Sequence, residues 1–165
     1  MDYSEAIEGF WVEVVLKVHN HLRPYIRLAS SGDVASAFAH MRELDREHFV
    51  LACVDAKLRV TAVHTVSVGT LTASIVHPRE VFKTAILANA SGIVLLHNHP
   101  SGDPAPSNED RRITERLEEA GRLLGIPVID HLVIGHDDGF YSFADDGALE
   151  PSLTSYRGMV MREEA

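Results

Sequence analysis

Two histidines and one aspartate in the second half of the chain have the types and the spacing of metal ligands. His97 and His99 stand two positions apart at the end of the apolar run 93–96, and residues two apart on a strand project from the same face. Asp110 follows after a loop rich in Pro and Gly, which can fold its carboxylate back toward both rings. Two imidazoles and one carboxylate are the ligand set of a catalytic zinc site, whose fourth position is left for water. The pattern therefore predicts one Zn²⁺ per chain and hydrolysis by zinc-activated water.

The same residues also have structural explanations. A pair of histidines at the end of a strand is often a pair of ordinary polar side chains. Ser107 and Asp110 stand at the start of a helical pattern and match a capping box, in which each side chain accepts a hydrogen bond from the other residue's backbone N–H. The two interpretations are compatible, because a helix N-terminus can carry a capping box and a metal ligand together.

The complete string from His97 to Asp110 (His-Asn-His-Pro-Ser-Gly-Asp-Pro-Ala-Pro-Ser-Asn-Glu-Asp) resembles the signature of the JAB/MPN+ (JAMM) metalloproteases. That signature is H-x-H, ten residues and then Asp, with a Ser three positions before the Asp and a Glu on an upstream element. Residues 77–80, 97–103 and 130–132 resemble the RadC-like branch in particular. The resemblance covers roughly residues 33–147.

The resemblance implies an α/β (α+β) fold of the MPN/JAB type, in which a mixed β-sheet is flanked by helices in a layering like that of cytidine deaminases. It implies zinc-dependent peptidase or isopeptidase activity with His97, His99 and Asp110 as the metal ligands. It also implies that the hydroxyl of Ser107 donates to the oxyanion of the reaction, a contribution worth roughly a hundred- to a thousandfold in rate.

Hydrolysis needs a carboxylate that takes a proton from the attacking water and hands it to the leaving nitrogen. Glu47 directly precedes the expected strand 48–55, where the family has its Glu, so we expect Glu47 to be this acid/base. Glu43, on the polar side of a predicted helix, ranks second. Glu80 and Glu109 fall in first helical turns, where a carboxylate simply complements the helix dipole.

Other polar residues near the motif have less specific interpretations. Asp130 and His131 are expected to support and orient a metal ligand, although His131 could equally be an ordinary core residue. Asp103 is interpreted as a turn residue, and Cys53, in an apolar strand, as a small core residue.

The elements that must position these residues follow from hydrophobic periodicity. Residues 1–30 predict an amphipathic helix and a linker, residues 31–147 the JAB/MPN domain, and residues 148–165 a weakly ordered tail. Within the domain, Asp33 is expected to be the N-cap of a helix that reaches Leu44, and Pro78 to stand in the first turn of another. The remaining predictions are strands at 48–55, 59–69, 70–76, 93–96, 128–134 and 141–143, and a helix at 107–124.

Composition limits the possible functions. The chain has 165 residues, which is enough for one domain, and its 24 acidic residues against 15 basic ones give a formal net charge of −9. Such a charge disfavours binding to nucleic acid. A single cysteine, no basic signal-like N-terminus and no apolar stretch long enough for a membrane predict a cytoplasmic protein without a membrane span.

We therefore expect a metallohydrolase whose substrate is a peptide or the tail of a ubiquitin-like protein. Two alternatives stay open: a metal-dependent action on nucleic acid or a role in DNA repair, as the RadC name suggests, and a non-catalytic MPN scaffold. The repair role is weakened because nothing in the chain resembles the helix-hairpin-helix segment common in RadC-like proteins. A zinc deaminase ranks below both alternatives, because one Cys cannot supply the Pro-Cys-x-x-Cys ligand pair of that class. The N-terminal helix is expected to dock on the protein's own core or to form a homodimer.

Overall fold

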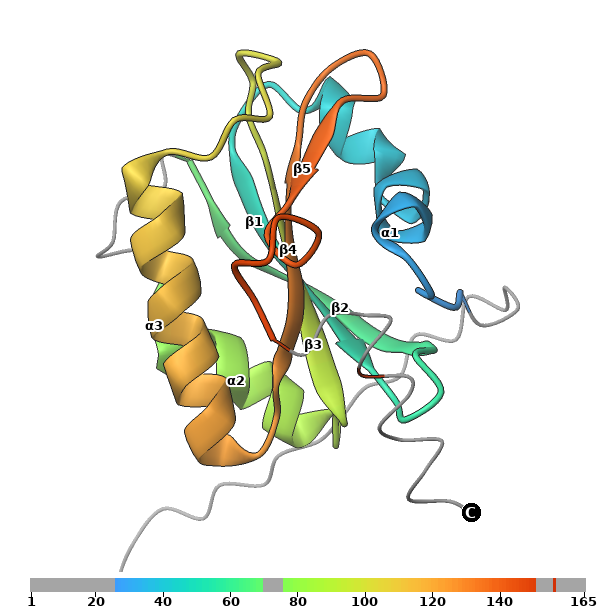
Figure 1. Cartoon of the computed structure of the whole chain (residues 1–165), viewed down its shortest axis with the longest axis vertical. Helices are drawn as coiled ribbons and strands as arrows, with labels where there is room; N and C mark the ends of the chain where they lie inside the picture. Colours follow the sequence, from blue (N-terminus) through green and yellow to red (C-terminus); the bar gives the residue numbers. More distant parts are fainter. Residues whose placement is uncertain (1–25, 70–75, 151–155, 157–165) are drawn as a thin grey trace, which may run out of the picture.

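The computed structural model describes residues 26–69, 76–150 and 156. Along the chain its elements are α1 (Ser31–Ala37), the 3-10 helix η1 (Ala39–Glu43), β1 (His48–Val54), β2 (Val60–Val68), α2 (Pro78–Leu87), β3 (Gly92–Asn98), α3 (Asn108–Leu124), β4 (Val128–Ile134) and β5 (Phe140–Ser142). The strands form one sheet in the order β2-β1-β3-β4-β5 (Figure 1). Only β3 and β4 are parallel, and α3 forms the crossover between them.

Helices cover both faces of this sheet. On one face, α1 and η1 pack against the even-numbered residues of β1 and β3, and on the other, α2 and α3 pack against the odd-numbered residues (Figure 1). The central strands β3 and β4 are buried along their whole length, as expected for strands covered on both sides. The fold is therefore α/β with a mixed sheet between helical layers, which confirms the expected MPN/JAB-type architecture.

The first helix begins earlier than the sequence predicts. Its N-cap is Ser30, whose hydroxyl accepts from the N–H of Asp33 at 3.2 Å. Asp33 lies in the first turn, and its carboxylate accepts from the N–H of Ala29 at 3.0 Å. The prediction of Asp33 as N-cap is therefore wrong by three residues. Ser30 caps the helix, and Asp33 is the third residue of its first turn. The expected single helix also breaks at Phe38 into the separate 3-10 turn η1.

The other predicted elements agree closely with the structure. The two strands from 48 to 69 form an antiparallel hairpin, and Pro78 opens α2. The long helix α3 ends at Gly125, which has a left-handed backbone with φ of 69°. The predicted N-terminal helix and nearly all of the strand expected at 70–76 lie outside the described residues.

The packed core also contains residues from outside the range 31–147. Leu28 and Leu149 are buried. Tyr156 is buried as well, and its hydroxyl donates to the carbonyl of Ser91 at 2.7 Å. Within the described ranges, none of the helices combines the length and the apolar character needed to cross a membrane.

Candidate metal centre

The end of β3 supplies the two histidines. His97 pairs with Phe49 of β1 and Val133 of β4, and strand alternation turns its side chain toward the face covered by α3. His99 follows directly after the strand, and its N–H donates to the carbonyl of Ile134 at 3.0 Å. His97 is fully buried, whereas the side chain of His99 is 17% exposed and borders a cavity.

The start of α3 supplies the carboxylate. Oδ2 of Asp110 accepts from the backbone N–H of Ser107 at 2.7 Å and from its hydroxyl at 2.6 Å, and Oγ of Ser107 accepts from the N–H of Asp110 at 3.2 Å. This arrangement is the predicted capping box. Because Oδ2 already takes two hydrogen bonds, Oδ1 is the oxygen left for another partner, and it lies 3.2 Å from Nε2 of His97.

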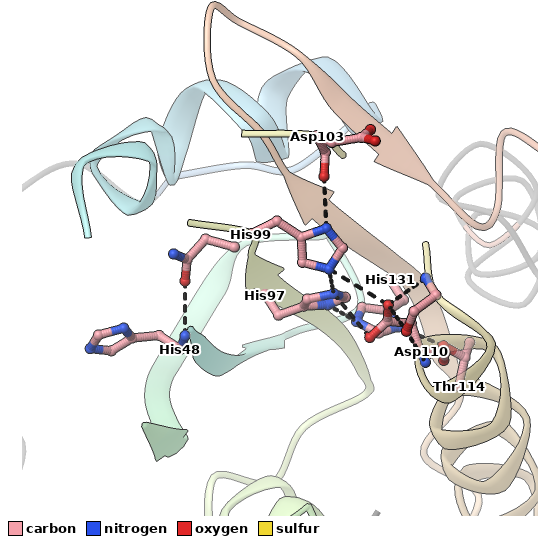
Figure 2. A network of polar contacts seen from close by, with 9 residues as sticks. His48, His97, His99, Asp103, Asp110, Thr114 and His131 are labelled. Carbon is pink, nitrogen blue, oxygen red and sulfur yellow. Dashed lines mark hydrogen bonds and ion pairs between the residues drawn. The ribbon is translucent and has the colours of Figure 1, made fainter. Parts of the chain in front are cut away.

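Three electron-pair donors therefore converge at one point (Figure 2). The two Nε2 atoms of His97 and His99 are 3.1 Å apart, Nε2 of His97 lies 3.2 Å from Oδ1 of Asp110, and Nε2 of His99 lies 3.6 Å from the other oxygen of that carboxylate, Oδ2. Ligand atoms about 2.0 to 2.1 Å from a tetrahedral zinc ion lie about 3.3 Å from one another. The donor set and its spacing thus fit a zinc ion.

The ring of His99 is oriented by its other nitrogen. Nδ1 lies 2.7 Å from the carbonyl oxygen of Asp103, which can only accept, so Nδ1 carries a proton and a neutral ring has its lone pair on Nε2. Asp103 is otherwise a turn residue, as expected, because its carboxylate accepts from the N–H of Ala105. The hydrogen bond to Asp110 raises the pKa of His99 above its ordinary value, against the opposing effect of burial.

The electrostatics keep the carboxylate charged. Burial alone would raise the pKa of Asp110, but the neighbouring imidazoles of His97 and His99 and the hydroxyl of Ser107 outweigh burial and hold that pKa far below its usual range. An ionised carboxylate beside two imidazole nitrogens is the form that binds a cation.

Glu47 completes this group. Within the described part of the chain, Glu47, His97, His99 and Asp110 form the one group of acidic and imidazole side chains with metal-binding spacing, and their ligand atoms lie within 4.8 Å of one another. Glu47 also lines the adjoining cavity of about 360 Å³, together with His99, Pro100, Ser101, Ser107 and Asp110. The second-ranked candidate, Glu43, is exposed on η1 and lies outside the group.

The backbone around Glu47 is held by a residue to which the sequence assigned no role. Asn98 is 1% exposed, and its side chain lies on the sheet face opposite His97. Its Oδ1 accepts from the N–H of His48 at 2.8 Å, and its Nδ2 donates to the carbonyl of Arg46 at 3.0 Å. The amide therefore bonds the residues on both sides of Glu47, and the position of Asn98 between the two histidines was the available signal.

Of the two residues expected to support a ligand, one contacts it. Nε2 of His131 lies 2.8 Å from Nδ1 of His97. His131 is fully buried between Phe49 and Phe143, and burial, followed by the nearby His97, lowers its pKa well below the ordinary value. The carboxylate of Asp130 instead bonds Ser142, the N–H of Ala144 and the N–H of His131.

A second unforeseen residue lies behind His131. Thr114 is 2% exposed on the buried face of α3, and its Oγ1 lies 2.6 Å from Nδ1 of His131. The same hydroxyl donates to the carbonyl of Asp110 at 2.6 Å. A threonine one turn after Asp110, on the apolar face of an amphipathic helix, was the signal in the sequence.

Residues 28–148 match the family model described as the RadC-like JAB domain. A UPF0758 protein from Thermotoga maritima is 46% identical over 139 residues, which cover 84% of this chain and 62% of that protein. Another from Symbiobacterium thermophilum is 57% identical over 109 residues, covering 66% of this chain and 46% of the relative. A third, from Methanosarcina barkeri, is 45% identical over 125 residues, covering 75% and 54%. The matched part of this chain spans about half the length of these relatives.

Proposed function

Because the chain belongs to the RadC-like JAB family, we propose that it is a zinc-dependent metallohydrolase that cleaves peptide or isopeptide bonds. The observation that carries this proposal is the convergence of His97, His99 and Asp110, whose ligand atoms lie within 4.8 Å of one another beside an open cavity. These three residues would hold the ion, and a bound zinc supplies Lewis acidity and lowers the pKa of water.

The remaining steps belong to side chains of this protein. Glu47, at the wall of the cavity, accepts a proton from the attacking water and delivers it to the leaving nitrogen. Ser107 lines the same cavity, but its hydroxyl donates to Asp110 in this structure. To stabilise an oxyanion, that hydroxyl has to turn from the carboxylate toward the substrate.

The character of the cavity favours a peptide over a phosphodiester. Its described lining contains Glu47 and Asp110 but no Lys or Arg, so the two carboxylates offset the charge of a bound zinc ion and no basic side chain of the lining is there to hold a phosphate group. The cavity is also open to solvent, which suits an extended chain such as the flexible tail of a ubiquitin-like protein better than an enclosed small molecule. The formal charge of −9 also disfavours nucleic acid.

Zinc content is the first test. The purified protein is expected to bind about one zinc per chain by elemental analysis, and His97→Ala or Asp110→Ala is expected to bind none. His64→Ala changes an exposed histidine of β2 and serves as the matched control that keeps the metal. Absence of zinc after purification and after titration would overturn the proposal.

The reaction is tested with the zinc-loaded protein on a peptide library, on fusions of ubiquitin-like proteins and on supercoiled plasmid. Glu47→Gln is expected to keep zinc and lose most peptide turnover, because the amide preserves shape without accepting a proton. Glu43→Gln is the control and stays active. An active Glu47→Gln with an inactive Glu43→Gln would reassign the acid/base. Plasmid cleavage that Glu47→Gln abolishes, with all peptides intact, would replace the peptidase with a nuclease.

A further inference from the structure

A chain of three short hydrogen bonds runs from the first turns of α3 to the back of His97. The carbonyl of Asp110, the hydroxyl of Thr114, the ring of His131 and Nδ1 of His97 follow one another at separations of 2.6, 2.6 and 2.8 Å. Figure 2 shows His131 beside His97, and Thr114 on the helix that also carries Asp110. The chemistry of each group decides where each proton in this chain lies.

The carbonyl at one end can only accept. A hydroxyl oxygen 2.6 Å from a carbonyl oxygen has to donate its proton, so the single proton of Thr114 is committed to Asp110. The hydroxyl then has only lone pairs to offer to Nδ1 of His131, which lies 2.6 Å away. Nδ1 of His131 therefore carries the N–H.

The tautomer of His131 determines that of His97. His131 is fully buried between two phenylalanine rings, an environment that favours the neutral imidazole. With its proton on Nδ1, its Nε2 is an acceptor, and Nδ1 of His97, 2.8 Å away, has to be the donor. A neutral His97 then has its lone pair on Nε2, the atom that faces His99 and Oδ1 of Asp110.

We propose that Thr114 and His131 are positioning residues that set the tautomer of His97, so that its Nε2 presents a lone pair to the metal ion. The inference rests on the proposed metal site. One helical turn then positions two ligands, because the carboxylate of Asp110 is itself a ligand and its carbonyl begins the chain of hydrogen bonds to His97, called the relay below. Without the hydroxyl, His131 can take the opposite tautomer and donate from its Nε2 to Nδ1 of His97. A neutral His97 then has its proton on Nε2, the atom that has to bind the metal.

The first test needs no variant. In metal-free protein labelled with ¹⁵N at histidine, the nitrogen shifts and the couplings to ring protons distinguish the two tautomers. We expect the proton of His97 on Nδ1 and that of His131 on Nδ1. A neutral His97 with its proton on Nε2 and none on Nδ1 would overturn the proposal, and this measurement can be made whether or not the protein binds zinc.

The second test compares Thr114→Val, which keeps the shape and removes the hydroxyl, with Thr114→Ser, which keeps the hydroxyl. Loss of a group that orients a metal ligand typically lowers affinity by about 10- to 100-fold, so we expect Thr114→Val to raise the Kd for zinc by about that factor, measured by competition with a chelator. Thr114→Ser is expected to bind zinc close to the native affinity and to keep the native tautomer.

The outcomes separate the two proposals. A native protein that binds no zinc contradicts the proposed function. In that case the tautomer of His97 still tests whether Thr114 and His131 set the position of its proton. A native protein that binds zinc, with Thr114→Val binding equally tightly and His97 still protonated on Nδ1, contradicts the relay and leaves the metal site intact. Unfolding curves of both variants show that the compared proteins are folded.

Discussion

At the scale of single residues, Asn98 connects the two expected ligands at the end of β3 to the expected acid/base, which directly precedes β1. Successive residues of a strand point to opposite faces, so the residue between His97 and His99 cannot reach their site. It reaches the backbone on both sides of Glu47 instead. The tripeptide 97–99 therefore supplies two expected metal ligands and also holds the backbone of the expected acid/base.

Asn98→Ala is expected to lower the free energy of unfolding by about 1 to 3 kcal/mol, because the N–H of His48 and the carbonyl of Arg46 lose buried partners. It should also reduce peptide turnover while zinc content stays at the native level, since the contacts among the ligands are unchanged. Urea unfolding, elemental analysis and the peptide assay measure these effects. The exposed Asn108 gives the control Asn108→Ala, and a variant at position 98 that matches it in all three would contradict this role.

At the scale of elements, the packing of α3 sets the position of both Asp110 and Thr114. Near its C-terminal end the helix approaches the segment before β4 so closely that a Cβ on Gly121 would lie 2.6 Å from the carbonyl oxygen of Ile126 and 3.2 Å from the ring of Phe82. The carbonyl of Gly121 also accepts from the N–H of Ile126 at 2.9 Å. This contact ties the helix to the strand that carries His131.

Gly121→Ala is therefore expected to destabilise the protein by about 1 to 3 kcal/mol, the usual effect of inserting a methyl group into a packed contact. Urea denaturation measures the loss. The control is Gly32→Ala in α1, where the nearest atom to an added Cβ is Oγ of Ser30 at 3.7 Å; alanine there should leave stability unchanged or raise it by about 0.5 to 1 kcal/mol. Equal behaviour of the two variants would mean that the helix can shift without loss.

At the scale of the whole molecule, the dependence of stability on pH reflects buried titratable groups with opposite effects. Burial raises the pKa of Asp130 from 3.8 to about 6, against hydrogen bonds from Ser142, Ala144 and His131. The native state then binds more protons than the unfolded state in that window, so this group lowers stability as pH rises. The depressed pKa of His131 acts in the other direction. As pH falls below 6.5 the unfolded state takes up a proton on this ring and the native state does not, so the free energy of unfolding decreases.

Asp130→Asn isolates the first effect. The amide Oδ1 can keep the bonds from the N–H groups of His131 and Ala144, and its Nδ2 can donate to Ser142. The free energy of unfolding of the native protein, minus that of the variant, is expected to fall by about 2 kcal/mol as pH rises from about 4 to about 6, because the limiting slope of about 1.4 kcal/mol per pH unit flattens near both pKa values. Denaturation at a series of pH values gives this difference, in which the contribution of His131 cancels. A flat difference curve would contradict the raised pKa.

Features that depend on neighbours along the chain were determined by the sequence itself. The buried run of β3, the proline that opens α2 and the capping box at Ser107 follow from local periodicity and local hydrogen bonding. The family signature by itself places His97, His99 and Asp110 in one group, and Glu47 joins that group in the structure.

Features that depend on register and on the rotation of a helix were decided only by the tertiary structure. The parallel pairing of β3 with β4 brings His131 beside Leu95 and within reach of His97, and the facing side of α3 brings Thr114 to the same ring. No periodicity encodes which of the buried polar residues meet, because hydrophobic patterning specifies a face and not a partner. The choice of Ser30 over Asp33 as the N-cap was likewise settled in three dimensions, since both residue types suit that position equally well.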